Sequence, residues 1–157
     1  MSKSIGYFTD VSNLYYCIRR KYGDRKLDYG KYLEYLEALG DTAVCIAYGA
    51  QVGSQAKAFI KKLHKIGYTT KYKQPKTFFE KRKADWDVGI TVDIIAMLDR
   101  LDIVIIGSAD SDLAPLVEYV QARGKEVVIF ASGISKDLRS IASNSIEIFE
   151  SLLEDKP

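Results

Sequence analysis

The segment that most limits the folds open to this chain is an apolar run that begins at Ile103. It is followed closely by Asp110 and Asp112 and then by a helical pattern. A short apolar run of this kind is typical of a strand that is buried on both faces. Strand-like and helix-like patterns alternate along the rest of the chain in the same way. This alternation predicts an α/β protein with a parallel sheet, because parallel strands need crossover connections, which are usually helices.

Hydrophobic periodicity and turn residues predict where these elements lie. The expected strands cover residues 4–9, 42–48, 68–73, 102–107 and 127–130, with a small final strand at 146–148. The expected helices cover residues 54–66, 85–99 and 113–123, with others that begin at Val11 and Asp28 and a short one capped by Ser135. The strand at 68–73 alternates in polarity and is expected at a sheet edge. We expect one domain over residues 1–153 and a frayed end over 154–157.

Composition narrows the class of protein. No apolar run approaches the ~20 residues of a membrane helix, and we expect neither a signal peptide nor a membrane segment. Cys17 and Cys45 lack a CxxC spacing and are interpreted as small buried hydrophobes in a reducing compartment, so we expect a cytoplasmic protein. His64 is the only histidine, which argues against a histidine-rich zinc site and a Ser-His-Asp triad.

Aspartates gather at the predicted strand ends and helix starts. Asp10 ends the first strand much as Asp110 follows the strand at 102–107, and the carboxyl ends of parallel strands share one edge of the sheet. Asp87 and Asp112 each open a helix, where a carboxylate alone is explained by the helix dipole. Together these acids predict a bound divalent cation, since clustered like charges are otherwise unfavourable. Mg²⁺ or Mn²⁺ is favoured, because oxygen ligands suit them.

Asp93 lies six residues after Asp87 among apolar neighbours. The two side chains are about 120° apart around a regular helix and roughly 9 Å apart along it, so they do not share one coordination sphere unless the helix starts irregularly. Asp93 is therefore left with three roles: a group that supports a ligand, an ion-pair partner, or a true metal ligand in place of Asp87. We predict that Asp87 is the ligand.

Basic and small polar residues supply candidate contacts to a phosphate-containing substrate. Residues 57–83 hold ten basic side chains and one acid, Glu80, a charge distribution that suits a polyanion as well as a simple solvated helix face. The predicted substrate-binding residues are Asn13, Ser108, Ser111, Lys61, Lys62, Lys65 and Lys83. Three aromatic residues are candidates for stacking on bases, although packing in the core or at its rim is the favoured interpretation: Tyr68, Tyr72 and Trp86.

Three motifs carry a family resemblance. They are Phe8-Thr-Asp10-Val-Ser-Asn13, then Lys83-Ala-Asp85-Trp-Asp87-Val with Asp93 six residues on, and Ser108-Ala-Asp110-Ser-Asp112-Leu-Ala-Pro115-Leu116. In their order and spacing they resemble the motifs of the NYN family, the LabA-like branch of the PIN-like nuclease superfamily. The resemblance covers nearly the whole chain.

The resemblance implies a three-layer α/β/α, PIN-like fold with a five-stranded parallel sheet in the order 3-2-1-4-5. It also implies a metal-dependent endoribonuclease that hydrolyses RNA phosphodiester bonds with Mg²⁺ or Mn²⁺. The implied catalytic and metal-binding residues are Asp10, Asp87, Asp110 and Asp112, with Asp93 as a further candidate ligand. Single-stranded RNA is the expected partner, and a homodimer is compatible with the resemblance.

Three residues depart from the family pattern. Val11 and Ala109 each replace a glycine beside a candidate ligand, and Leu113 replaces a phenylalanine. A glycine replaced by another residue restricts the backbone if the position needs a positive φ. A non-catalytic RNA-binding or scaffold protein and a DNA nuclease remain alternatives, because residue types do not disclose contacts to a 2′-hydroxyl. A phosphoacceptor receiver is disfavoured, since the strand at 127–130 is not followed by the lysine that such a domain needs.

Overall fold

The computed structural model describes residues 2–50, 53–73 and 85–156. Within these residues six strands form one sheet in the order β3-β2-β1-β4-β5-β6, and each neighbouring pair is parallel. The strands are β1 (Ser4–Asp10), β2 (Asp41–Ala50), β3 (Thr69–Lys73), β4 (Ile103–Gly107), β5 (Glu126–Ala131) and β6 (Asn144–Glu147). The predicted order of the first five strands and the edge position of β3 are confirmed, and β6 extends the sheet beyond β5.

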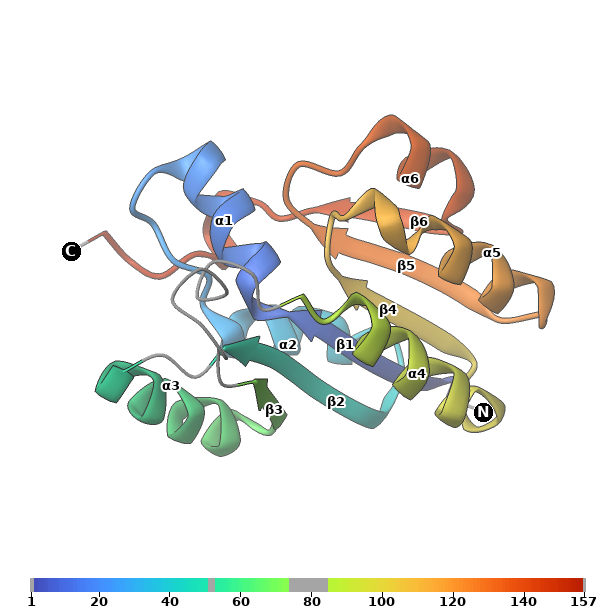
Figure 1. Cartoon of the computed structure of the whole chain (residues 1–157), viewed down its shortest axis with the longest axis horizontal. Helices are drawn as coiled ribbons and strands as arrows, with labels where there is room; N and C mark the ends of the chain where they lie inside the picture. The colour runs from blue at the N-terminus through green and yellow to red at the C-terminus, as the bar shows by residue number, and fades with distance from the viewer. Residues whose placement is uncertain (1, 51–52, 74–84, 157) are drawn as a thin grey trace.

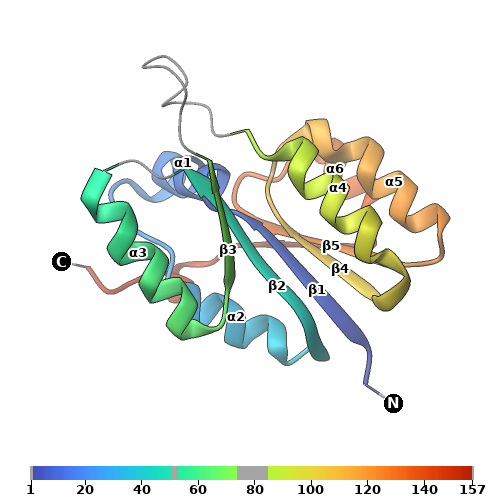
Figure 2. The same ribbon diagram turned by 60° about the horizontal axis from the view of Figure 1, so that its bottom comes forward.

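Helices cover both faces of the sheet, so the fold has three layers. The helices are α1 (Val11–Tyr22), α2 (Tyr29–Glu37), α3 (Gly53–Ile66), α4 (Asp87–Met97), α5 (Ala114–Ala122) and α6 (Lys136–Ile141). Figures 1 and 2 show α1, α2 and α3 on one side of the sheet and α4, α5 and α6 on the other. The strand order reverses between β1 and β4, and ligands of open α/β sheets bind at such a switch point, outside the carboxyl ends of the strands.

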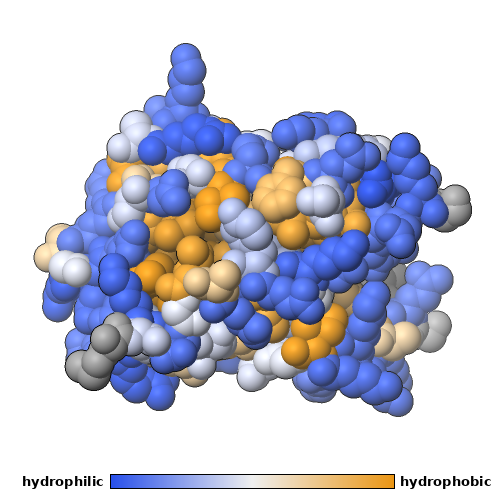
Figure 3. All heavy atoms as spheres, turned by 180° about the vertical axis from the view of Figure 1, so that it is seen from behind, coloured by the Kyte–Doolittle hydropathy of each residue, from blue (hydrophilic) through white to orange (hydrophobic). Residues whose placement is uncertain are grey.

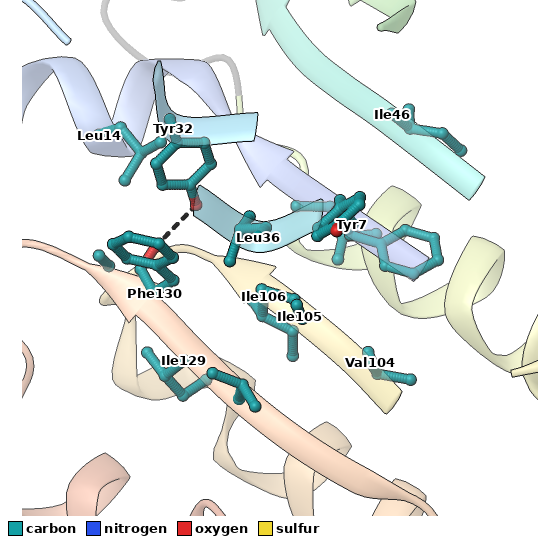
Figure 4. Packing of buried hydrophobic residues seen from close by; sticks show 14 of the residues in the cluster. Tyr7, Leu14, Tyr32, Leu36, Ile46, Val104, Ile105, Ile106, Ile129 and Phe130 are labelled. Carbon is teal, nitrogen blue, oxygen red and sulfur yellow. Dashed lines mark hydrogen bonds between the residues drawn. The ribbon is translucent and has the colours of Figure 1, made fainter. Parts of the chain in front are cut away.

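The core lies on both faces of the central strands. The four isoleucine and valine residues at 103–106 are all buried, as the apolar run predicted. On the α2 side, Tyr32 packs on Phe130, with ring centroids 4.6 Å apart, and its hydroxyl donates a hydrogen bond of 2.9 Å to the Phe130 carbonyl (Figure 4). This bond satisfies a buried hydroxyl and fastens α2 to β5.

The chain end is held against the loop between α1 and α2. The backbone N–H of Glu154 donates to the carbonyl of Lys26 at 2.7 Å, and the guanidinium of Arg25 donates to the carbonyl of Glu154 at 2.9 Å. Leu27 and Leu153 form an antiparallel bridge in the same place. Glu154, which the sequence placed in a frayed end, is therefore an anchored residue.

The surface combines hydrophilic residues with limited apolar areas. Figure 3 shows the side that α2 covers, where hydrophobic residues gather between hydrophilic ones. Exposed large side chains of the described residues include Tyr35 and Leu39 near α2 and Val88, Val92 on α4. No helix in the described part of the chain has both the length and the hydrophobicity needed to cross a bilayer.

Gly107 ends β4 opposite Thr9 of β1, where there is no room for a side chain. A Cβ at this position would lie 2.7 Å from the Tyr32 hydroxyl and 3.1 Å from the Thr9 Cα, which is backbone and cannot move aside cheaply. We predict that Gly107→Ala lowers the free energy of unfolding by about 1–3 kcal/mol, measured by urea denaturation. The loss should be smaller in a Tyr32→Phe background, which lacks the clashing hydroxyl. A variant within about 0.5 kcal/mol of wild type would contradict this packing.

Candidate functional site

Asp10 is the last residue of β1 and caps the N-terminus of α1. Its Oδ1 accepts a hydrogen bond of 3.1 Å from the backbone N–H of Asn13, as an N-cap aspartate does. Only 5% of Asp10 is exposed. The pKa of Asp10 is raised to about 6, mainly by burial and also by the charges of Asp85 and Asp110, although the Asn13 N–H opposes the shift.

Three further aspartates come together beside the end of β4: Asp87, Asp110 and Asp112. Each offers one carboxylate oxygen, and these oxygens all lie within 4.8 Å of one another. Asp87 is the first residue of α4, while Asp110 follows β4 and its Oδ1 accepts a 2.9 Å hydrogen bond from the N–H of Asp112. Among the residues that the structure describes, these are the ones that form such a group, which we call the aspartate group.

Repulsion within this region is visible in the pKa of Asp87, which is raised to about 7. Burial is the largest cause, followed by the charge of Asp110 and the direct contact with its carboxyl, and then by the charges of Asp85 and Asp10. Asp10 lies outside the aspartate group by distance, yet its charge acts on Asp87. The four carboxylates therefore face one region, as the sequence predicted.

Two of the predicted substrate-binding residues hold the loop that carries Asp110. The side-chain oxygen of Asn13 accepts a 3.0 Å hydrogen bond from the N–H of Ala109, which ties α1 to the loop after β4. The hydroxyl of Ser108 accepts a 3.2 Å hydrogen bond from the N–H of Asp110. Ser108 has no exposed surface, so the predicted contact between Ser108 and substrate is wrong. Ser111 is exposed on the turn beside Asp110 and is open to substrate.

Asp93 is engaged in an ion pair. Its Oδ2 lies 2.8 Å from the Lys71 Nζ of β3 and accepts a 2.8 Å hydrogen bond from the Tyr48 hydroxyl of β2. These contacts neutralise the carboxylate and join α4 to two strands. Asp93 also lies outside the aspartate group. The inclusion of Asp93 among the metal ligands is therefore corrected, and the structure gives it the ion-pair role that the sequence had left open.

The aromatic candidates serve mainly in packing. Tyr68 is buried and its hydroxyl donates to the Tyr29 carbonyl at 3.0 Å, so it packs in the core, the interpretation that the sequence favoured over stacking on bases. The indole N–H of Trp86 donates to the Gly49 carbonyl at 2.9 Å, and the Lys73 Nζ lies 4.4 Å from the centre of its ring. Trp86 therefore anchors the residues that lead into Asp87. This anchor could not be predicted from the sequence, because nothing local marks which carbonyl an indole reaches.

The basic residues lie apart from the aspartate group. Lys61, Lys62 and Lys65 are exposed on α3, on the opposite side of the sheet from α4 (Figure 2). Lys62 forms an ion pair of 3.0 Å with Glu154. Lys83 lies outside the described residues. A polyanionic ligand that contacts both α3 and the aspartate group must therefore pass over the carboxyl edge of the sheet.

The donor set fits a hard divalent cation. Three carboxylate oxygens from separate residues lie close enough to face one ion, and oxygen ligands of this kind suit Mg²⁺ and Mn²⁺. The raised pKa values of Asp10 and Asp87 show that the folded chain leaves their negative charge uncompensated. A bound cation would supply that compensation.

Comparison with known proteins places the chain in a family. The model of the NYN domain family matches residues 4–150, so this protein belongs to the NYN domain family, whose members are generally nuclease-like. A crystal structure of a protein of unknown function, VPA0982 from Vibrio parahaemolyticus RIMD 2210633, is similar, with 29% sequence identity and a TM-score of 0.88. That similarity covers 98% of this chain and 97% of the other. No match to the chain is found among curated proteins.

The departures from the family pattern are accommodated by ordinary backbone geometry. In the described residues every position with a positive φ is a glycine, so neither Val11 nor Ala109 has a conformation that needs glycine. Val11 opens α1, and Leu113 is buried in the core where the family pattern has phenylalanine. These substitutions leave the aspartates in place.

The raised pKa values predict a pH-dependent stability for the metal-free protein. The aspartates ionise at about 3.9 in the unfolded chain but near 6 for Asp10 and 7 for Asp87 in the folded state, so stability is lost as pH rises through this interval. The two shifts taken at face value give a loss of about 4 kcal/mol between pH 5 and pH 8. Because solvent screens the half-exposed Asp87, we expect the free energy of unfolding in EDTA to fall by about 2 kcal/mol over this range. Saturating Mn²⁺ should restore it at pH 8, and Asp87→Asn should flatten the profile. A flat wild-type profile in EDTA would contradict the site's electrostatics.

Titration with Mn²⁺ separates Asp87 from Asp93. Asp87→Asn should weaken Mn²⁺ binding by about tenfold or more, because it removes an oxygen of the aspartate group. Asp93→Asn is the matched control: we expect near wild-type Mn²⁺ affinity but lower stability, because Lys71 loses its partner. Isothermal titration calorimetry gives the affinities. The reverse pattern, with Mn²⁺ binding lost only in Asp93→Asn, would show that the ion pair opens to bind metal.

Proposed function

We propose that this protein is a metal-dependent endoribonuclease that hydrolyses phosphodiester bonds of single-stranded RNA in the cytoplasm. The observation that carries the proposal is the aspartate group, which lies at the carboxyl edge of the sheet where the strand order reverses. Membership of the NYN family supports the same reaction class, because NYN nucleases act on RNA. Two half-buried free cysteines are consistent with a reducing compartment.

Asp87, Asp110 and Asp112 would hold Mg²⁺ or Mn²⁺, with Asp10 beside them. When bound, the ion would supply Lewis-acid activation of water and stabilisation of charge on the phosphate. The chain's own contribution is to keep these carboxylates in position before substrate arrives. The carboxylate of Asp10 is held by a hydrogen bond from the backbone N–H of Asn13. The carboxylate of Asp110 is held by a hydrogen bond from the backbone N–H of Asp112.

Some residues around the aspartate group position its carboxylates, and others are exposed and available to contact the substrate. Asn13 and Ser108 hold the backbone on either side of Ala109, so they position Asp110 without needing to touch the substrate. Asp112 and Ser111 are exposed at the mouth of the site. We assign to Asp112 the orientation of the attacking water and to Ser111 a hydrogen bond to a phosphate oxygen.

A cleavage assay tests the proposal. Wild-type protein should cut 5′-labelled single-stranded RNA in Mg²⁺ or Mn²⁺ and leave it intact in EDTA, whereas Asp110→Asn should lose nearly all activity while keeping its circular dichroism spectrum. Asp99→Asn is the matched control, because Asp99 is an exposed aspartate just beyond the other end of α4 and should cut like wild type.

The same assay decides among the alternatives. DNA of the same sequence, cut as fast as the RNA, would identify a DNA nuclease. RNA that is bound but never cut would identify a binding protein with a retained acidic pocket. RNA that Asp110→Asn cuts as fast as wild type would show that cleavage does not depend on the aspartate group, and either result would contradict the proposed function.

A further inference from the structure

A cavity of about 520 Å³ lies between α1 and α3, on the face of the sheet away from α4. Much of its lining is apolar or aromatic: Val11 and Ile18 come from α1, Phe59 from α3, and Leu27 and Tyr29 from the chain between α1 and α2 and its junction with α2. The ring centroids of Tyr29 and Phe59 are 5.5 Å apart and the rings are tilted by 58°, so they form an angled aromatic wall. No residue of the aspartate group lines this cavity.

The cavity reaches the start of α1, next to Asp10. Val11 lines it and follows Asp10 directly, so their Cα atoms are about 3.8 Å apart. Asp10 caps α1, and α1 forms one wall of the cavity along its length from Val11 to Ile18. Figure 1 shows α1 continuing from the end of β1 with α3 on the same side of the molecule. The cavity thus reaches the residue that follows Asp10, whose charge acts on Asp87.

Basic residues stand at the cavity. Lys26, Lys62 and Arg25 line it against a single acid, Glu154. Arg25 is committed to the chain end, since it donates to the Glu154 carbonyl and to the Glu150 carboxylate. The side chain of Lys62 is 59% exposed, and exposed ion pairs such as Lys62–Glu154 contribute little stability. Lys62 can therefore leave Glu154 to bind a phosphate with little loss of stability. Lys26 is exposed and can bind a phosphate as well.

We propose that this cavity binds one nucleotide of the RNA strand, with its base against the wall of Tyr29 and Phe59 and its phosphate at Lys26 and Lys62. The volume suits a small-molecule ligand, and the combination of an apolar aromatic wall with cations matches a base joined to a phosphate. A purely apolar peptide segment would leave the cations unused. The inference rests on the proposed function, since it places the bound nucleotide next to the one held at the aspartates.

This arrangement accounts for the separation between the α3 lysines and the aspartate group. The strand passes over the carboxyl edge of the sheet, with its scissile bond on the α4 side and a flanking nucleotide between α1 and α3. Base recognition in the cavity would give the enzyme a preference for one class of base beside the cut.

The test measures nucleotide binding directly, in EDTA, with the fluorescent probe 2-aminopurine riboside 5′-monophosphate. Ala56 lines the cavity, so Ala56→Trp fills it, while Ala122→Trp puts the same side chain on an exposed alanine of α5. We expect wild type and Ala122→Trp to bind equally, and Ala56→Trp to bind at least about tenfold more weakly. Equal binding by a folded Ala56→Trp, or no saturable binding by wild type, would overturn the proposal.

A charge variant keeps the proposal testable if Ala56→Trp does not fold. Lys26→Gln combined with Lys62→Gln should weaken probe binding and flatten its dependence on salt, because fewer phosphate contacts remain. An unchanged affinity and salt slope would overturn the proposal. The binding needs neither metal nor catalysis, so a protein that binds the probe but never cuts RNA would refute only the proposed function. Metal-dependent cleavage without probe binding would refute only the cavity's role.

Discussion

Electrostatic repulsion between carboxylates at one edge of the sheet is the constraint around which this structure is organised. β1 and β4 are neighbours because the strand order reverses between them, and their carboxyl ends bring Asp10 and Asp110 to the same edge. α4 then starts with Asp87 against Asp110. Burial, and after it the neighbouring carboxylates, raises the pKa of Asp10 and Asp87, so their ionised forms are unfavourable for the chain alone.

The surrounding contacts hold the carboxylates together against that repulsion. Asn13 connects α1 to Ala109, and Ser108 accepts the N–H of Asp110, so the loop after β4 is held at two adjacent residues. On α4 the ion pair between Asp93 and Lys71 and the hydrogen bond from Tyr48 hold the helix to β2 and β3. Asp87 and Asp93 thus differ in their surroundings: Lys71 neutralises Asp93, whereas Asp87 faces the carboxyl of Asp110.

Much of this could be predicted from the sequence because it depends on local patterns. Apolar runs and helix starts predicted the alternation of elements. Aspartates at strand ends and helix starts predicted a carboxylate cluster, which the structure forms from Asp87, Asp110 and Asp112 with Asp10 outside it. The partner of Asp93 could not be predicted, since Asp93 lies on α4 and Lys71 lies 22 residues away on the strand β3. The burial of Ser108 and Tyr68 likewise depends on neighbours from distant segments, as does the anchoring of Glu154 by Arg25. Residue type alone does not show that Ser108 is buried or that Glu154 is anchored.

The central claim is that the aspartate group is a metal centre, and the location of a bound ion tests it most directly. Crystals soaked in Mn²⁺ and measured at the manganese absorption edge would show where the ion lies. We predict an anomalous peak among Asp87, Asp110 and Asp112, with Asp10 beside it and the Asp93–Lys71 pair unchanged. A peak at Asp93, or no peak at the aspartate group under saturating Mn²⁺, would contradict the claim.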